Sequence, residues 1–107
     1  MIAPTPEPPY YAVIFTNELT TQTEGYHEMA DKMCELALQH KGCLGYESAR
    51  NELGITISYW ATLDDIRVWK ANAEHMVAQQ QGKDIWYKCY KTRICRVERD
   101  YGFERNP

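Results

Sequence analysis

The sequence lacks the short motifs that mark the best-known enzyme classes. Its 107 residues hold no Walker loop, no dinucleotide-binding glycine fingerprint, no nucleophile elbow and no zinc-protease motif. The cysteines form no C-x-x-C pair and have no zinc-type spacing, and buried packing is the favoured interpretation of Cys34, Cys43, Cys89 and Cys95. Motifs therefore indicate no nucleotide, serine-hydrolase or zinc chemistry.

Long apolar runs and clustered positive charges are also missing. No run approaches the ~20 residues of a membrane helix, and residues 1–9 lack the basic and apolar regions of a secretory signal. The net charge is −3, and Lys and Arg are scattered among acids, which argues against a phosphate track. We expect a cytoplasmic protein with reduced thiols and with neither nucleic acid nor membrane as a partner.

Proline is concentrated at one end of the chain. Four of the five prolines fall within residues 1–9, and proline fits neither a helix interior nor a strand ladder. This predicts an extended N-terminal arm over residues 1–9, followed by a single domain over residues 10–107.

The remaining sequence alternates between strand and helix patterns. Period-two alternation predicts strands, and apolar residues spaced three and four apart predict helices. The strands are expected at residues 10–17, 43–50 (bulged at Gly45), 55–61 and about 90–101. The helices are expected at residues 26–40, capped by Gly42, and from an N-cap at Thr62 to about 73, with a possible break near Asn72, helical composition to 81 and another turn at 85–87.

This order, β-α-β-β-α-β, predicts the ferredoxin-like α+β fold: a four-stranded antiparallel sheet with both helices on one face. The other face of the sheet would still carry apolar side chains, and a large exposed apolar patch is unfavourable in water. We therefore expect a homodimer in which two sheets pack face to face, as in a dimeric α/β barrel.

Aromatic residues are abundant, with eight Tyr, three Trp and two Phe, and they suit a core or an apolar pocket. Part of the sequence resembles a known family, and the stretches that carry this resemblance are residues 10–17, 54–60, 69–70, 74–79, 82–83, 86–87 and 97–101. The family is the antibiotic-biosynthesis-monooxygenase superfamily, in the branch of small bacterial proteins related to heme-degrading monooxygenases. The resemblance covers roughly residues 10–103.

The resemblance implies a dimer with an apolar pocket in each subunit, between the helices and the sheet. Some members oxygenate polycyclic aromatic substrates without a cofactor, and others bind and degrade heme. The heme degraders use an Asn on the first strand, matched by Asn17, and a Trp on the second main helix, matched by Trp69. Their ligand His falls where this chain has Gln79 rather than at His75, so heme ligation is in doubt.

Each candidate also has a structural interpretation. Asn17 could simply begin the following loop, and Trp69 could be ordinary core. His75 could be an iron ligand if the helix register shifts, a polar or acid/base group of the pocket, or a surface residue. His27 and His40 lie at the ends of a helix and are expected to be exposed.

The leading hypothesis is a monooxygenase that acts on a flat, apolar aromatic ligand, either with no cofactor or with heme as both cofactor and substrate. Phe15, Trp60 and Trp69 would line the substrate pocket. Asn17 would orient oxygen and His75 would help to move a proton. The alternative is a non-catalytic dimer of the same fold that binds a small aromatic molecule or heme.

Overall fold

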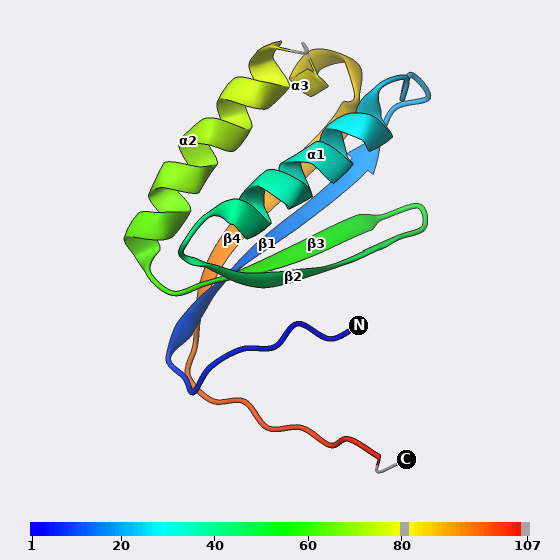
Figure 1. The fold of residues 1–107 in the computed structure, drawn as a ribbon. Helices are drawn as coiled ribbons and strands as arrows, with labels where there is room; N and C mark the ends of the chain where they lie inside the picture. Colours follow the sequence, from blue (N-terminus) through cyan, green and yellow to red (C-terminus); the bar gives the residue numbers. More distant parts are fainter. Residues whose placement is uncertain (80–81, 106–107) are drawn as a thin grey trace.

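The computed structural model describes residues 1–79 and 82–105, with the side chains of residues 78, 79, 82 and 83 left out. Figure 1 shows a four-stranded sheet with two long helices on one face. The elements are β1 (Tyr10–Leu19), α1 (Tyr26–Gln39), β2 (Cys43–Arg50), β3 (Gly54–Trp60), α2 (Leu63–Gln79), α3 (Gly82–Ile85) and β4 (Tyr87–Val97). The strand order is β2-β3-β1-β4, and every neighbouring pair is antiparallel. The predicted ferredoxin-like fold is confirmed.

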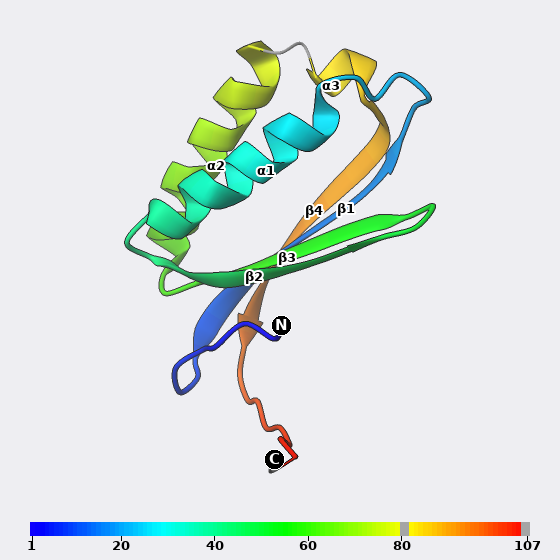
Figure 2. The ribbon, with the colours of Figure 1, turned by 45° about the vertical axis from the view of Figure 1, so that its right-hand side comes forward.

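The core lies between the sheet and the helices, around Trp60 at the end of β3. Trp60 is completely buried and packs with Ala37 of α1 and Ile66 of α2. Tyr11 and Val13 of β1 pack against this cluster, so the odd-numbered residues of β1 face the helices. Figure 2 shows α1 and α2 lying over this face while the other face stays uncovered by helices.

The second helix differs from the prediction, because α2 runs without a break from Leu63 to Gln79. Asn72 therefore does not interrupt it, and the Lys70–Glu74 pair, one turn apart, spans the expected break with an N–O distance of 3.7 Å. The Thr62 cap is confirmed, since its Oγ1 accepts the Asp65 N–H at 3.0 Å. The turn expected at residues 85–87 follows the short helix α3, which ends at Ile85, and Trp86 forms that turn before β4.

The last strand is displaced from the prediction, because β4 begins at Tyr87 and ends at Val97. Its start is set by pairing with Leu19, beyond a register shift in β1. Its end is set by Tyr10, the partner of Val97. Pro9 precedes Tyr10 and has no N–H to continue the ladder.

Two glycines sit at close approaches. The predicted bulge at Gly45 is confirmed by a register shift and a φ of +143°. Gly42 is not the cap of α1, which is His40, whose N–H donates to Ala37 O at 2.9 Å. Gly42 instead lets the Asp65 carboxylate, at the start of α2, lie close over its backbone, since a Cβ at position 42 would overlap it.

The cysteines do not share one environment. Cys34 and Cys43 are half-buried, and burial raises the pKa of both thiols. Cys89 and Cys95 are exposed on β4, so the expectation of buried packing is wrong for them. The reason is that β4 is an edge strand, and the face on which these two residues lie carries no helix.

The N-terminal arm lies against the helix-free face of the sheet. The Ala3 N–H donates to Glu47 Oε2 at 2.9 Å, and the Tyr59 hydroxyl donates to Glu47 Oε1 at 2.7 Å. At the base of the arm, Tyr10 donates to Asp100 Oδ2 at 2.5 Å. Burial and the Glu47 carboxylate raise the pKa of Tyr59 to about 12. The arm thus covers one end of this face.

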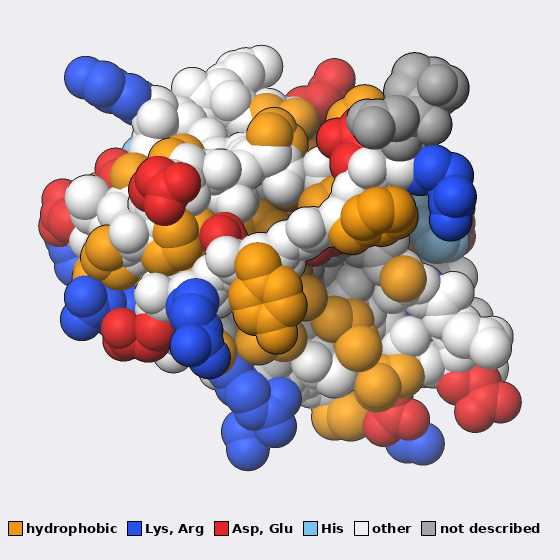
Figure 3. Space-filling view, turned by 90° about the horizontal axis from the view of Figure 1, so that it is seen from below, with side chains coloured by type: hydrophobic (Ala, Val, Ile, Leu, Met, Phe, Trp, Pro, Cys, Tyr) orange, Lys and Arg blue, Asp and Glu red, His pale blue; other side chains and the backbone are white. Residues whose placement is uncertain are grey.

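Apolar side chains beyond the arm stay partly open to water. Ile14 and Ile57 are half-buried neighbours on this face, and Ile55 is 38% exposed. Figure 3 shows hydrophobic side chains gathered in a hollow on this lower side of the molecule. Within residues 1–79 and 82–105, no helix is long and apolar enough to span a membrane.

Candidate functional site

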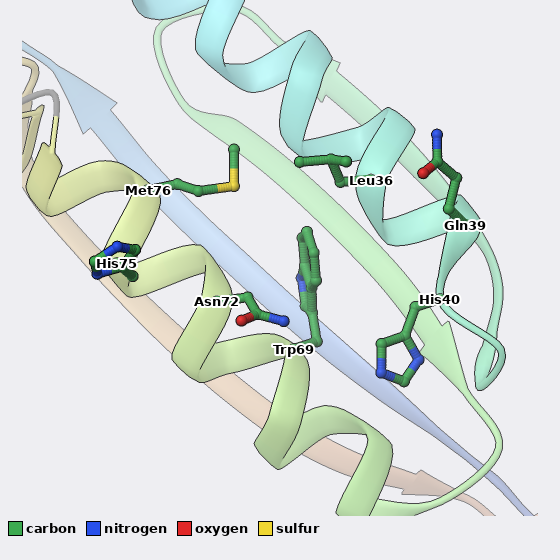
Figure 4. Close-up of a pocket in the computed structure, with 7 residues that line it drawn as sticks. All are labelled: Leu36, Gln39, His40, Trp69, Asn72, His75 and Met76. Carbon is green, nitrogen blue, oxygen red and sulfur yellow. The ribbon is translucent and has the colours of Figure 1, made fainter.

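A groove of about 380 Å³ lies between α1 and α2. Its walls combine apolar side chains with a few amide and imidazole groups, from both helices (Figure 4). The lining residues are Leu36, Gln39, His40, Trp69, Asn72, His75 and Met76. Their spacing of three and four along each helix explains why they meet on facing sides.

The floor of the groove is aromatic. The Trp69 ring stacks on Trp60 with a centroid distance of 6.1 Å and an interplanar angle of 26°. Trp60 is fixed below it, because its Nε1–H donates to Ser58 Oγ at 2.8 Å. Trp69 alone lines the groove, and its indole, backed by the buried Trp60, gives a flat, polarizable surface of the kind that suits a planar aromatic ligand. The structure therefore places Trp60 and Trp69 together, with Trp69 exposed to the groove.

His40 closes one end of the groove, and the expectation that it is exposed is wrong. Its ring meets Trp60 edge-on at 5.4 Å, and its Nδ1 accepts the Gly42 N–H at 3.1 Å. An imidazole that accepts through Nδ1 carries its proton on Nε2 when neutral. Its position at the end of a helix predicts exposure, but the turn at Gly42 places the His40 ring against Trp60 in the core.

His75 lies at the rim of the groove. Its side chain is exposed, and Figure 4 shows it along α2, farther from α1 than Asn72 and Trp69. The side chain of Gln79, where the heme degraders' ligand would fall, is outside the described residues. The sequence predicts Asn72 only as a possible helix break, but its side chain points into the groove (Figure 4). Its spacing of three from Trp69 is the signal that could have identified it.

Asn17 and Phe15 lie elsewhere. Asn17 is 2% exposed and is part of β1, not the start of a loop. Its Oδ1 accepts a hydrogen bond from Arg50 Nη2, and that nitrogen also donates to the Tyr26 hydroxyl at 3.2 Å. Tyr26 begins α1 and His40 follows its end, so the two positions are about 20 Å apart along the helix. The predicted site residues thus divide between two ends of α1.

Heme would require an axial ligand over the indole floor, normally a neutral imidazole. His40 uses Nδ1 in its own turn, and His75 sits at the rim. Among the described residues, no group of three His, Cys, Asp or Glu side chains is arranged to hold a metal ion.

Comparison with known sequences gives one informative relative. The chain is 42% identical over 107 residues to the uncharacterized protein YqjZ of Bacillus subtilis, covering 98% of this chain and 94% of that protein. No family model matches the chain.

Solved structures share the fold at low sequence identity. PA3566 from Pseudomonas aeruginosa superposes with a TM-score of 0.68 at 17% identity, over 91% of this chain and 100% of that one. SnoaB from Streptomyces nogalater, a cofactor-independent oxygenase, gives 0.69 at 7% identity, over 85% and 95%. A Nitrosomonas europaea protein classed with the antibiotic biosynthesis monooxygenases gives 0.66 at 14% identity, over 87% and 93%.

Proposed function

Because the chain belongs to the family of Bacillus subtilis YqjZ and has the fold of the antibiotic-biosynthesis-monooxygenase superfamily, we propose that it is a cofactor-independent monooxygenase. Its substrate would be a flat, apolar phenol bound in the groove between α1 and α2. The observation that carries this proposal is the Trp60–Trp69 stack, which gives the groove an aromatic floor. The relation to SnoaB, itself a cofactor-independent oxygenase, supports the reaction class.

In the proposed reaction the substrate supplies the electrons. The phenol loses its proton, and the resulting anion, rich in electrons at the ring carbons, reduces O₂. One oxygen atom bonds to the ring carbon para to the hydroxyl and forms a quinone, and the other leaves as water with two hydrogens of the substrate. Trp69 holds the ring, while the imidazoles of His40 and His75, which line the groove, take up the proton and return it.

A non-catalytic binder is the second candidate, and one observation favours it. Asn17 was expected to orient oxygen, but its Oδ1 is held by Arg50 and it does not line the groove. A groove that has an aromatic floor but lacks Asn17 could bind an aromatic molecule without oxidising it. The same fold would then serve binding alone.

One experiment separates these candidates. 1-Naphthol would be titrated into the protein with tryptophan fluorescence as the readout, and oxygen uptake would be followed in the same samples. The proposal predicts saturable quenching and oxygen uptake with naphthoquinone formation, both lost in Trp69→Leu. Trp86→Phe is the matched control, since Trp86 packs beside Tyr26 at the other end of α1.

Quenching without oxygen uptake would support the binder, and neither signal would overturn both candidates. A parallel hemin titration should show no saturable Soret shift. A shift at one hemin per subunit that disappears in His75→Ala would move the protein to the heme-linked branch.

We also propose that the partner is a second copy of the chain, placed against the helix-free face of the sheet. Ile14, Ile55 and Ile57 lie there, and burying them would remove apolar surface from water. Sedimentation equilibrium should give twice the monomer mass, and a pure monomer at micromolar concentration would contradict this. We expect the protein in the cytoplasm, where its thiols would stay reduced.

A further inference from the structure

Arg50, the last residue of β2, reaches across a neighbouring strand. In the sheet, Arg50 pairs with Gly54 of β3, and Gly54 pairs with Asn17 of β1. The guanidinium lies directly over Gly54, because a Cβ at that position would overlap it. Only glycine therefore lets the cation cross β3 and reach the buried amide of Asn17. The positions of Arg50, Gly54 and Asn17 are therefore fixed by the register of three neighbouring strands.

The charge of Arg50 is unmatched among the described residues. The ion pairs within residues 1–79 and 82–105 join Arg67 to Asp64, Lys70 to Glu74 and Arg96 to Glu98. The hydrogen bonds found for Arg50 in this part of the chain use only Nη2, to Asn17 and Tyr26. A guanidinium has five N–H donors, so the edge that carries Nη1 still has donors for an anion. The residue is exposed, which leaves that edge within reach of a ligand.

One side of this cation is aromatic. Arg50 Cζ lies 5.5 Å from the centre of the Tyr26 ring, and Tyr87 meets Tyr26 edge-on at 5.8 Å. Burial, followed by the neighbouring Tyr26, raises the pKa of Tyr87, while the Arg50 charge acts in the opposite direction. The Tyr87 hydroxyl thus stays protonated at neutral pH and does not neutralise the cation.

The surface of β4 next to these tyrosines is exposed to solvent. Phe15 packs against Tyr90 at 5.6 Å, and Tyr90 and Ile94, on the same face of β4, are 45% and 49% exposed. Neither long helix covers this part of β4 (Figure 2). Tyr87 meets Phe15 at 5.7 Å as well as Tyr26, so a planar ring on Phe15 and Tyr90 would lie next to the rings that flank the guanidinium.

We propose that Arg50 binds the carboxylate of a small aromatic acid whose ring packs on Phe15 and Tyr90. Both bidentate edges of a guanidinium include Nη2, which already donates to Asn17 and Tyr26. Nη1 would therefore give the carboxylate a charge-assisted hydrogen bond, which an uncharged ligand cannot match. This site lies at the N-terminal end of α1, whereas the groove floored by Trp69 lies at the other end. The two can succeed or fail independently.

The test is a titration of benzoate into ¹⁵N-labelled protein, with benzamide as the uncharged ligand of the same shape. Benzoate should shift the amide signals of Asn17, Gly54 and Tyr26 along saturable curves, and benzamide should bind at least about tenfold more weakly. Arg50→Gln should weaken benzoate binding by about tenfold or more, because it removes the charge-assisted hydrogen bond. Arg67→Gln is the control, since Arg67 is an exposed arginine paired with Asp64, and it should leave the affinity unchanged.

Gly54→Ala gives a second, independent variant. It keeps the charge of Arg50 but displaces the guanidinium from its position over residue 54, so it should weaken benzoate as Arg50→Gln does. If Arg50→Gln does not fold, Gly54→Ala serves as the test of whether Arg50 binds the carboxylate. Equal affinity for benzoate and benzamide, an Arg50→Gln affinity within about twofold of the native value, or no saturation by about 20 mM would each overturn the proposal. So would shifts confined to Trp69 and Met76.

Discussion

The two ends of α1 are built in different ways. At its C-terminal end, the groove is formed by side chains three and four residues apart on two helices, over the stacked indoles of Trp60 and Trp69. At its N-terminal end, Arg50 and Asn17 come from different strands and meet because Gly54 lies between them. The first end is held mainly by packing, whereas the second combines packed aromatic rings with directional hydrogen bonds from Arg50. The difference predicts that substitutions at the two ends will fail in different ways.

The largest effect is expected at the packed end, from Trp60→Ala. Trp60 is 0% exposed and contacts the rings of His40 and Trp69, so its removal leaves a cavity that the sheet and helices cannot fill. The expected loss in the free energy of unfolding is about 3–5 kcal/mol, as for other buried Trp or Phe truncations. Urea denaturation followed by circular dichroism measures it.

Trp69→Ala is the matched variant, because Trp69 is only partly buried at the same stack. It should cost clearly less stability than Trp60→Ala while abolishing ligand quenching in the groove. Equal losses for the two variants would show that Trp69 is core rather than ligand surface, which is the structural interpretation of that residue.

A smaller effect is expected at the hydrogen-bonded end, from Asn17→Ala. The substitution removes the acceptor for Arg50 Nη2, and losing one partner of a charge-assisted hydrogen bond costs roughly 1–3 kcal/mol. Because Asn17 does not line the groove, naphthol binding there should be unchanged. Denaturation and the fluorescence titration on the same preparation measure both.

A second outcome for Asn17→Ala would join the two ends of α1 in one function. If oxygen uptake disappears while naphthol binding in the groove persists, both ends act in one reaction. Asn17 would then orient oxygen, as the sequence predicts. Asn17→Asp separates charge from packing, since it keeps an acceptor for Arg50 and should retain most of the stability.

The contrast between the two ends also explains what the sequence could predict. The strand and helix order and the Thr62 cap follow from local patterns, and the spacing of Trp69 and Asn72 follows from helical geometry. The contact of Arg50 with Asn17 joins residues 33 apart, and it depends on strand register, which no local pattern specifies. Register also decides the ends of β4, which explains why that prediction missed them. The placement of His40 depended on a turn that brings its ring onto Trp60.

The smallest effect is expected at the N-terminal arm, where Glu47 joins the arm to the sheet. Hydrogen bonds from Tyr59 and from the Ala3 N–H lower the pKa of Glu47 below its ordinary value of 4.5. The carboxylate therefore favours the docked arm above pH 4.5, and that contribution is lost as the pH falls through the lowered pKa. Tyr59 acts in the opposite sense, because its pKa is raised from 10.0 to about 12. Its contribution is present below pH 10 and is lost as the pH rises through about 12.

The Ala3 amide signal, followed by NMR as the pH is lowered from 6, should report release of the arm, and Glu47→Gln should abolish that titration. Glu47 is only partly buried, so the change in global stability should be small, as for other interactions near the surface. An Ala3 signal that ignores acid in the native protein would show that the arm is held by packing against Gly45 instead. The arm would then belong with the packed end of the comparison rather than with the hydrogen-bonded one.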